Sequence, residues 1–194
     1  MRLRHGEFSK AAWCPRLRSR FQYFSPEVYY ETAVQQIVGE GRSWIDIGGG
    51  HARFLSNDNL AVLLSRSCRR LVAVDPSDNV HSNPYVQERV QAFLEDYRAA
   101  EPFDVATAHM VIEHVAKPEE FVASLARVLK PGGMAILLTA DKWAPITIVS
   151  RFTPFGFHVF VEKFLWKSKN KDTFPTVYKM NTQPDLRRLM GRRS

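Results

Sequence analysis

The sequence contains only two cysteines, Cys14 and Cys68, which lie far apart in the chain. Two cysteines cannot build a disulfide framework, and their spacing is not that of zinc ligands, so we expect neither a disulfide scaffold nor a metal site. No run of about 18 or more apolar residues occurs, which argues against a transmembrane helix. The amino terminus is basic but lacks the apolar core of a signal peptide. We therefore expect a cytoplasmic protein.

Internal repeats and low-complexity segments are also absent. The 194 residues, 45% of them hydrophobic, suffice for one ordinary core, so we expect a single domain over residues 1–194. The net charge is +7, and the excess of basic residues lies at the two ends. Basic ends can attract nucleic acid, anionic lipid or an acidic substrate, but a solvated charged face is the simpler interpretation.

The most informative stretch runs from Ser43 to Phe54, where a short apolar strand leads into Gly48, Gly49 and Gly50. Glycines can adopt backbone angles closed to other residues, and they have no side chain to keep a ligand away from the main chain. A helix expected to begin near His51 would point its free N–H groups at the same place. Ligands in open α/β sheets bind at the carboxyl ends of the strands. The sequence therefore predicts a cofactor site at the three glycines.

Two cofactor classes fit such a turn, a dinucleotide and S-adenosylmethionine, and Asp46 favours the second. A carboxylate two positions before the first glycine would repel a pyrophosphate, whereas it suits the cationic amino group of S-adenosylmethionine. A nicotinamide-dependent oxidoreductase is the weaker alternative, also because the sequence has no recognisable catalytic Tyr-Lys pair.

A second acid, Asp75, ends the apolar strand predicted over Leu71–Asp75. A carboxylate at the end of the second strand is placed to accept hydrogen bonds from the two ribose hydroxyls of an adenosine. The alternative is a capping role before Pro76. A third short strand is predicted from Val90 to Leu94. Glu95, Asp96 or the backbone near Leu94 could reach the adenine amino group.

Helices alternate with the buried strands along the rest of the chain, which predicts an α/β fold with a doubly wound, mainly parallel, Rossmann-like sheet. A first helix begins at Ser25-Pro26-Glu27, with an apolar stripe of Val28, Tyr29, Ala33, Ile37 and Val38. The further expected elements are a helix from Leu60 to Arg69, a strand over Phe103–Ala108, a helix from Pro118 that ends at Lys130-Pro131-Gly132-Gly133, and a strand over Met134–Thr139.

Four features in this order resemble the class I S-adenosylmethionine-dependent methyltransferases and cover about residues 43–140. They are Asp46-Ile47-Gly48-Gly49-Gly50, Val74-Asp75, Phe103-Asp104 through Ile112-Glu113-His114-Val115, and Leu129-Lys130-Pro131-Gly132-Gly133. The last two motifs look most like the branch with quinone-biosynthesis and other small-molecule methyltransferases. The resemblance implies that Asp46 and Gly48–Gly50 bind the methionine part of the cofactor. It also implies that Asp75 binds the ribose, that Pro76 and Ser77 after it contact the cofactor, and that His109 lines the cleft near the sulfonium.

The chain departs from the family pattern at its end. The family's sheet normally finishes with an antiparallel hairpin after a last helix, and the final residues from Asp185 look like that helix, so the hairpin is expected to be absent. The fifth strand would then be an edge with apolar surface to cover. The apolar segment from Trp143 to Trp166 could cover it, act as a substrate lid or contact a membrane surface, and a second subunit in a homodimer could cover it instead.

Within the single domain we therefore expect a basic arm (1–20), a first helix (21–41), a cofactor-binding core (43–140) and a substrate-side or lid segment (141–194). The predicted activity is methyl transfer from S-adenosylmethionine to a small-molecule acceptor, at oxygen. An oxygen acceptor needs a base, and His114, His109 and His158 are the candidates, because histidine titrates near neutrality. Of the three, His114 is the residue to which we assign this role. His158, Tyr178 and Asn181 are the candidate substrate contacts. The alternative is a catalytically silent partner subunit. Nucleic acid is not expected as a substrate, since no Asn-Pro-Pro-Tyr-like motif follows the fourth strand.

Overall fold

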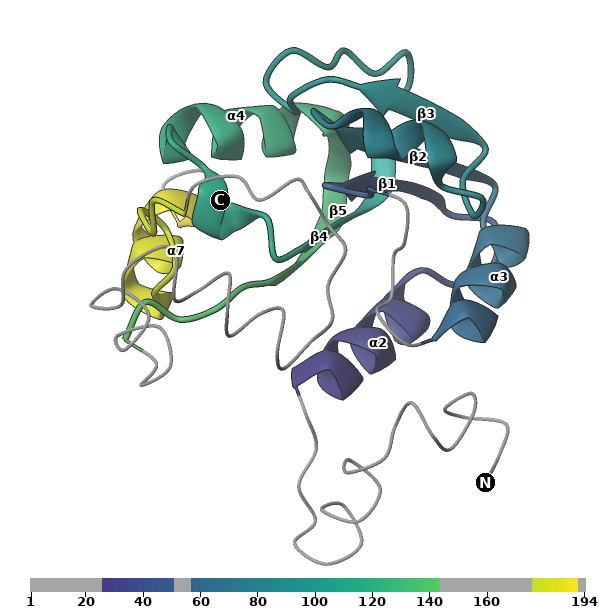
Figure 1. Cartoon of the computed structure of the whole chain (residues 1–194), viewed down its shortest axis with the longest axis horizontal. Coiled ribbons are helices and arrows are strands. Elements are labelled where there is room, and N and C mark those ends of the chain that lie inside the picture. Colours follow the sequence, from purple (N-terminus) through teal and green to yellow (C-terminus); the bar gives the residue numbers. More distant parts are fainter. Residues whose placement is uncertain (1–25, 51–56, 144–175, 192–194) are drawn as a thin grey trace, which may run out of the picture. The chain divides into compact units, whose positions relative to one another are not determined.

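The computed structural model describes residues 26–50, 57–143 and 176–191. Its largest feature is a five-stranded sheet (Figure 1) in the order β3-β2-β1-β4-β5, in which every neighbouring pair is parallel. The strands are β1 (Ser43–Ile47), β2 (Arg70–Asp75), β3 (Glu88–Gln91), β4 (Phe103–His109) and β5 (Leu129–Leu138). This arrangement confirms the predicted α/β, Rossmann-like fold.

β1 lies in the middle of the sheet and is buried along its whole length. Its residue Asp46 is opposite Ala73 of β2 on one side and opposite Thr107 of β4 on the other. The strand order reverses at β1, because β2 follows on one side and β4 on the other. Ligands of doubly wound sheets bind outside the carboxyl ends of the strands at this point. The fold therefore places the glycine turn after β1 where a ligand is expected.

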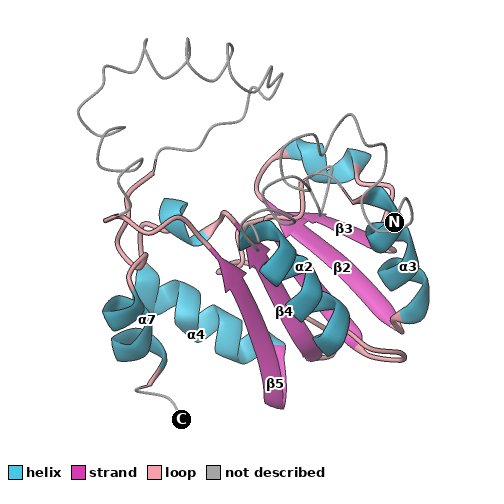
Figure 2. Ribbon diagram, turned by 90° about the horizontal axis from the view of Figure 1, so that it is seen from below, coloured by secondary structure: helices cyan, strands magenta, loops and turns pink. Residues whose placement is uncertain are grey.

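Two helices, α2 (Pro26–Ile37) and α3 (Asp58–Ser67), lie on the same side of the sheet (Figure 2). Tyr30, Val34 and Val38 belong to one buried cluster with residues of α3 and of the strands. The apolar stripe predicted for α2 was wrong in part, because Tyr29 is 64% exposed whereas Tyr30 is 4% exposed. The i, i+4 row through Tyr30 faces the sheet, and the pattern of two adjacent tyrosines did not reveal which of them would be buried.

The amino end of α3 is capped by Asn57. Its side-chain oxygen accepts a hydrogen bond from Leu60 N at 3.2 Å, and its amide nitrogen donates to Glu31 Oε2 of α2 at 3.0 Å. The helix that we expected to begin near His51 falls in residues 51–56, outside the described residues. Asn57 thus joins the two helices that cover this face of the sheet.

Two strands have boundaries that differ from the prediction. β3 begins at Glu88 rather than Val90, and its residues are mostly exposed, so no apolar run marks it. β5 begins at Leu129, directly after α4 (Pro118–Val128). Lys130–Gly133, predicted to end the helix, therefore lies inside the strand, and a register shift between Phe103 and Val105 of β4 accommodates it.

β5 is the edge strand of the described sheet, as predicted, and its residue Met134 is 40% exposed. After β5, the described residues 139–143 and 176–191 contain one helix, α7 (Gln183–Met190), and no strand. No antiparallel hairpin therefore follows β5 in these two ranges. Most of the segment predicted as a cover or lid lies outside the described residues.

The chain divides into two compact units, Met1–His109 with Ala123–Leu138 and Met110–Val122 with Thr139–Ser194. The first contains the sheet, α2 and α3, and the second contains the short helix η3 (Ile112–His114) and α7. That they form one domain stays a prediction.

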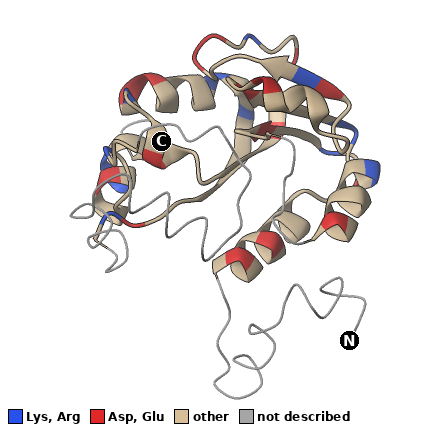
Figure 3. Cartoon of the chain, in the orientation of Figure 1, with Lys and Arg blue, Asp and Glu red and all other residues tan. Residues whose placement is uncertain are grey.

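Residues of both charge signs occur on the described helices (Figure 3), and the predicted basic arm (1–20) lies outside the described residues. None of the helices in the described part of the chain is both long and apolar enough to cross a membrane.

Candidate cofactor site

The turn after β1 depends on two of its glycines. Gly48 and Gly50 have φ angles of +69° and +29°, which L-residues with a side chain rarely adopt. Gly48 N also donates a hydrogen bond to Val74 O of β2 at 2.8 Å. The turn is thereby tied to the carboxyl end of the neighbouring strand.

Gly49 is required for a different reason, which is close packing. A Cβ atom at this position would lie 2.8 Å from Ala73 Cβ and 3.1 Å from Asp46 Oδ2. The first distance is shorter than real Cβ contacts allow, so the backbone here approaches β2 as closely as a glycine permits. At Gly50, by contrast, a Cβ would meet only Asp75 Oδ2, at 3.8 Å.

The carboxylate of Asp46 accepts a hydrogen bond from Thr107, which in turn accepts one from Trp44. Thr107 Oγ1 donates to Asp46 Oδ1 at 2.6 Å, and Trp44 Nε1 donates to Thr107 Oγ1 at 2.8 Å. Asp46 is 3% exposed, and buried charges need such partners to offset their lost hydration. These hydrogen bonds therefore fix the direction of the Asp46 carboxylate.

Asp75 is held by backbone groups on both of its oxygens. Gly50 N donates to Oδ2 at 3.0 Å, and Ser77 N donates to Oδ1 at 2.8 Å. The bond to Ser77 is the capping contact that was the alternative interpretation of Asp75, and it occurs together with the bond to the glycine turn. Each carboxylate oxygen can accept more than one hydrogen bond, so the geometry leaves acceptor capacity for hydroxyl groups.

Asn83 is a further residue that binds the glycine turn, and the sequence analysis missed it. Its side chain is fully buried, its Nδ2 donates to Gly49 O at 2.8 Å, and its Oδ1 accepts from Tyr85 N at 3.0 Å. The stretch around Asn83 resembled an ordinary loop, and only an asparagine before Pro84 marked it. Asp46, Gly48–Gly50 and Asp75 are thus brought together with a buried amide beneath them.

His109 ends β4 and contacts α2. Its Nε2 lies 2.8 Å from Glu27 Oε2, and its ring centre is 5.1 Å from that of Tyr30 at an interplanar angle of 54°. The sequence predicted His109 at the cofactor but gave Glu27, which is 82 residues away in the chain, no role at the site. Near Asp75, the carbonyl of the half-buried Pro76 accepts a hydrogen bond from Gln91 Nε2 at 3.4 Å. Glu95 is also half-buried, and its carbonyl accepts from Arg98 and Arg127.

The second unit contains three of the other predicted residues. Asn181 is 2% exposed, and its Nδ2 donates to Thr139 Oγ1 at 2.5 Å and to Ala140 O at 3.1 Å. Thr139 Oγ1 in turn donates to the buried carboxylate of Glu113 at 2.9 Å. Tyr178, with a φ of +49°, donates its backbone N–H to Glu113 O at 3.1 Å.

His114, the candidate base, is half-buried in η3, next to Glu113. His158 lies outside the described residues. Glu113, which appeared in the sequence only as part of a motif, is thus the residue to which Thr139 and Tyr178 attach.

A parallel sheet with an acid and glycine turn after its first strand, and a second acid at the end of the next, defines the class I methyltransferase fold, whose cofactor is S-adenosylmethionine. A family model described as a methyltransferase domain matches residues 14–192. The chain therefore belongs to the family of methyltransferase domains.

Among curated proteins, the chain is 32% identical over 117 residues to a ubiquinone biosynthesis O-methyltransferase of Caulobacter vibrioides, a match that covers 53% of this chain and 42% of the relative. It is also 32% identical over 103 residues to an uncharacterized methyltransferase of Mycobacterium avium, covering 50% and 39%. The matched region thus spans less than half the length of these relatives. Among solved structures, N-methyltransferase NodS from Bradyrhizobium japonicum has a TM-score of 0.49 at 16% identity, covering 63% of this chain and 79% of that one.

Proposed function

We propose that the protein transfers a methyl group from S-adenosylmethionine to an oxygen atom of a small molecule. The observation that carries this proposal is the meeting of two oriented carboxylates at one glycine turn. Asp46 is the last residue but one of β1, Asp75 ends β2, and Gly50 N donates a hydrogen bond to Asp75 directly. This arrangement suits a cofactor with a cationic amino group at one end and a ribose at the other.

Each part of the site has a distinct task in this proposal. Asp46 accepts hydrogen bonds from the amino group of the cofactor, directly or through water, and Gly48–Gly50 let its methionine part lie against the backbone. Asp75 accepts from the ribose hydroxyls, with Pro76 and Ser77 beside them, and Glu95 lies toward the adenine. When bound, S-adenosylmethionine supplies an already activated methyl group, so the protein mainly has to exclude water and align the acceptor.

A dinucleotide fits the same turn less well. Asp46 is buried, and its carboxylate lies 3.1 Å from where a Cβ of Gly49 would be. A pyrophosphate placed on this turn would meet that charge at short range in a poorly solvated setting, which is costly. The buried acid therefore supports the methyltransferase over the nicotinamide-dependent alternative.

Oxygen is the proposed acceptor atom because the Caulobacter vibrioides relative above is named a ubiquinone biosynthesis O-methyltransferase, and because the chain offers histidines to take up a proton. His114 is the base that we assign from the sequence, and His109, the last residue of β4, is another candidate. Tyr178, Asn181 and His158 are the proposed substrate contacts. Asn181 supports this role, since its buried Oδ1 has no hydrogen-bond partner within the part of the chain that the structure describes.

The test is a transfer assay with S-adenosylmethionine labelled in its methyl group and a panel of phenols, carboxylic acids and amines. The proposal predicts label on a phenol or carboxylate, and less label with Asp75→Ala at the same, subsaturating cofactor concentration. Label on amines alone would contradict the assignment to oxygen. Binding of the cofactor without transfer to any acceptor would favour the silent partner subunit.

A further inference from the structure

The peptide group between Gly49 and Gly50 is bound at both of its ends. Its carbonyl, Gly49 O, accepts a hydrogen bond from Asn83 Nδ2 at 2.8 Å, and its N–H, on Gly50, donates to Asp75 Oδ2 at 3.0 Å. The carbonyl and the N–H of a trans peptide lie in one plane and point in opposite directions, so a partner on one side also sets the direction of the other. This single peptide group therefore connects a buried amide with the acid that ends β2.

The glycine turn needs such a partner, because glycines do not fix their own backbone. Gly48 and Gly50 have φ angles of +69° and +29°, and a glycine adopts positive angles about as readily as negative ones. Three glycines in a row therefore have little intrinsic preference for one direction of the peptide between the last two. The hydrogen bond from Asn83 selects the direction in which Gly50 N faces Asp75.

Asn83 is itself held firmly in place. Its side chain is fully buried, its backbone N–H donates to Val80 O at 3.2 Å, and its carbonyl accepts from Arg89 Nε of β3 at 2.7 Å. Its Oδ1 accepts from Tyr85 N at 3.0 Å, which leaves Nδ2 as the atom that faces the carbonyl of Gly49. The side chain cannot turn away from the glycine turn without losing the bond to Tyr85 as well.

The two oxygens of Asp75 differ in what holds them. Oδ1 accepts from Ser77 N at 2.8 Å, two residues further along the chain, and the backbone carbonyl of Asp75 accepts from Ala92 N at 3.1 Å. Oδ2 accepts from Gly50 N, whose direction depends on Asn83. The local chain thus fixes one side of the carboxylate, and the glycine turn fixes the other.

From these contacts we infer that Asn83 is a positioning residue for the ribose of the cofactor. By fixing the Gly49–Gly50 peptide it holds Asp75 Oδ2 in the direction in which the ribose hydroxyls meet it. Asn83 acts through Asp75 and not by contacting the cofactor itself. The inference rests on the proposed function, in which Asp75 accepts hydrogen bonds from the ribose.

The first test compares S-adenosylhomocysteine with its 2′,3′-dideoxy analogue, which lacks the hydroxyls that Asp75 would bind. Asn83→Ala in the full chain should weaken binding of S-adenosylhomocysteine about fivefold, as the loss of one hydrogen bond does, and change binding of the analogue less than about twofold. Calorimetric titration measures both. A general loosening of the fold would weaken the two ligands equally, so equal losses, or no loss for either ligand, would overturn the inference.

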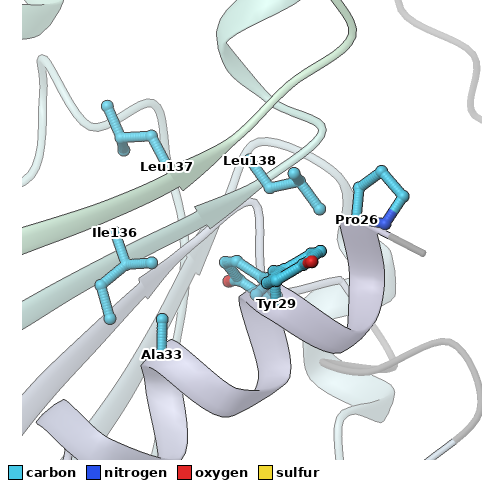
Figure 4. A pocket seen from close by; sticks show the side chains of 7 residues that line it. Pro26, Tyr29, Ala33, Ile136, Leu137 and Leu138 are labelled. Carbon is cyan, nitrogen blue, oxygen red and sulfur yellow. The ribbon is translucent and has the colours of Figure 1, made fainter. Parts of the chain in front are cut away.

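Ile136→Ala is the control for a loss of packing elsewhere in the same unit. Ile136 of β5 lines an apolar hollow beside α2 (Figure 4) and packs against the buried cluster, without contact to the glycine turn in the hydrogen-bond network described above. This variant should change the affinities of the two ligands by the same factor. A selective loss of S-adenosylhomocysteine binding in Ile136→Ala would show that any destabilisation produces the effect, and would overturn the inference.

A measurement without substitution covers the case in which Asn83→Ala does not fold. In NMR spectra of the unmodified protein, the side-chain amide of Asn83 should shift more with S-adenosylhomocysteine than with the dideoxy analogue, because only the former draws on Asp75. The side-chain amide of Gln87, which donates to Ser65 O at 3.2 Å just before β3, should respond equally to both ligands. Equal shifts of Asn83 with both ligands would overturn the inference.

The same titrations separate this inference from the proposed function. If S-adenosylhomocysteine does not bind the unmodified protein, the proposed function fails and the role of Asn83 fails with it. If it binds normally but Asn83→Ala shows no selective loss, only the role of Asn83 is overturned.

Discussion

At the scale of single residues, the two acids of the site are oriented by different means. Asp46 depends on side chains of two strands, through Thr107 and Trp44, whereas Asp75 depends on the backbone N–H groups of Gly50 and Ser77. Backbone donors fix Asp75 to the shape of the glycine turn itself. A substitution in the glycine turn and a substitution of Asp75 should therefore have related effects on cofactor binding.

Replacing Asp75 with alanine should weaken S-adenosylmethionine binding by about 1–3 kcal/mol, because the ribose hydroxyls and the two backbone N–H groups all lose their acceptor. Isothermal titration calorimetry measures this directly. Glu101→Ala removes an exposed acid just before β4 and serves as the control with expected unchanged affinity. Unchanged affinity in Asp75→Ala would refute the ribose assignment.

Gly49→Ala should lower the free energy of unfolding by about 1–3 kcal/mol, since the new methyl group would lie 2.8 Å from Ala73 Cβ and force the turn away from β2. Gly39→Ala is the matched control, because a Cβ there meets nothing within 4 Å. Urea denaturation of both variants gives the comparison. Equal stability of the two would show that the turn adjusts without cost.

At the scale of secondary-structure elements, the amino ends of three strands are joined by one acid. Asp104 Oδ2 of β4 accepts from Ser43 N at 2.8 Å and Ser43 Oγ at 2.7 Å, and its Oδ1 accepts from Lys130 Nζ of β5 at 2.7 Å. Burial opposes the charged form of Asp104, but the bonds from Lys130 and Ser43 outweigh it and hold the pKa of this carboxyl well below its usual range. Asp104 therefore ties β1, β4 and β5 together at the end of the sheet away from the glycine turn.

The lowered pKa of Asp104 predicts a loss of stability in acid. A carboxyl whose pKa is depressed in the folded state contributes stability that is complete above its unfolded pKa of about 3.9 and is lost as the pH falls toward the folded value. The gap in unfolding free energy between the unmodified protein and Asp104→Asn should be roughly 1.5–3 kcal/mol at pH 7 and should shrink below pH 4. Denaturation of both proteins at pH 7 and at a pH below 4 checks this. A difference in unfolding free energy that is the same at the two pH values would contradict it.

The buried elements could be predicted from the sequence, and the exposed ones only in part. β1, β2 and β4 were recognisable because strands buried on both faces are continuous apolar runs. β3 is exposed and was displaced by two residues at its start. β5 includes Pro131 and two glycines, which an edge strand tolerates and which a sequence pattern assigns to a turn.

The residues of the site also fall into two groups, those that a local motif reveals and those that it does not. Asp46, the glycines and Asp75 belong to short local motifs, so the sequence could identify them, although their roles at the cofactor stay predictions. Thr107 and Glu27 could not be found, because they reach Asp46 and His109 across 61 and 82 residues. Such contacts depend on the strand register and on which face of α2 is buried, and neither can be predicted from a local sequence pattern.

At the scale of the whole molecule, the second unit has its own internal support. Lys142 Nζ lies 3.1 Å from Asp185 Oδ2, and Thr182 caps α7 by accepting from Asp185 N at 3.2 Å. Lys142 follows β5 closely in the chain, so this ion pair fixes α7 to the segment after the edge strand. A single domain, a cytoplasmic location, a homodimer that covers β5 and a membrane-surface contact all stay predictions.

The central claim is that the glycine turn and its two acids bind S-adenosylmethionine, and calorimetric titration of the purified chain tests it most directly. S-adenosylmethionine and S-adenosylhomocysteine are titrated separately, with NADH as the control. The account predicts micromolar binding of the first two and none of NADH. Binding of NADH, or of none of the three, would contradict it.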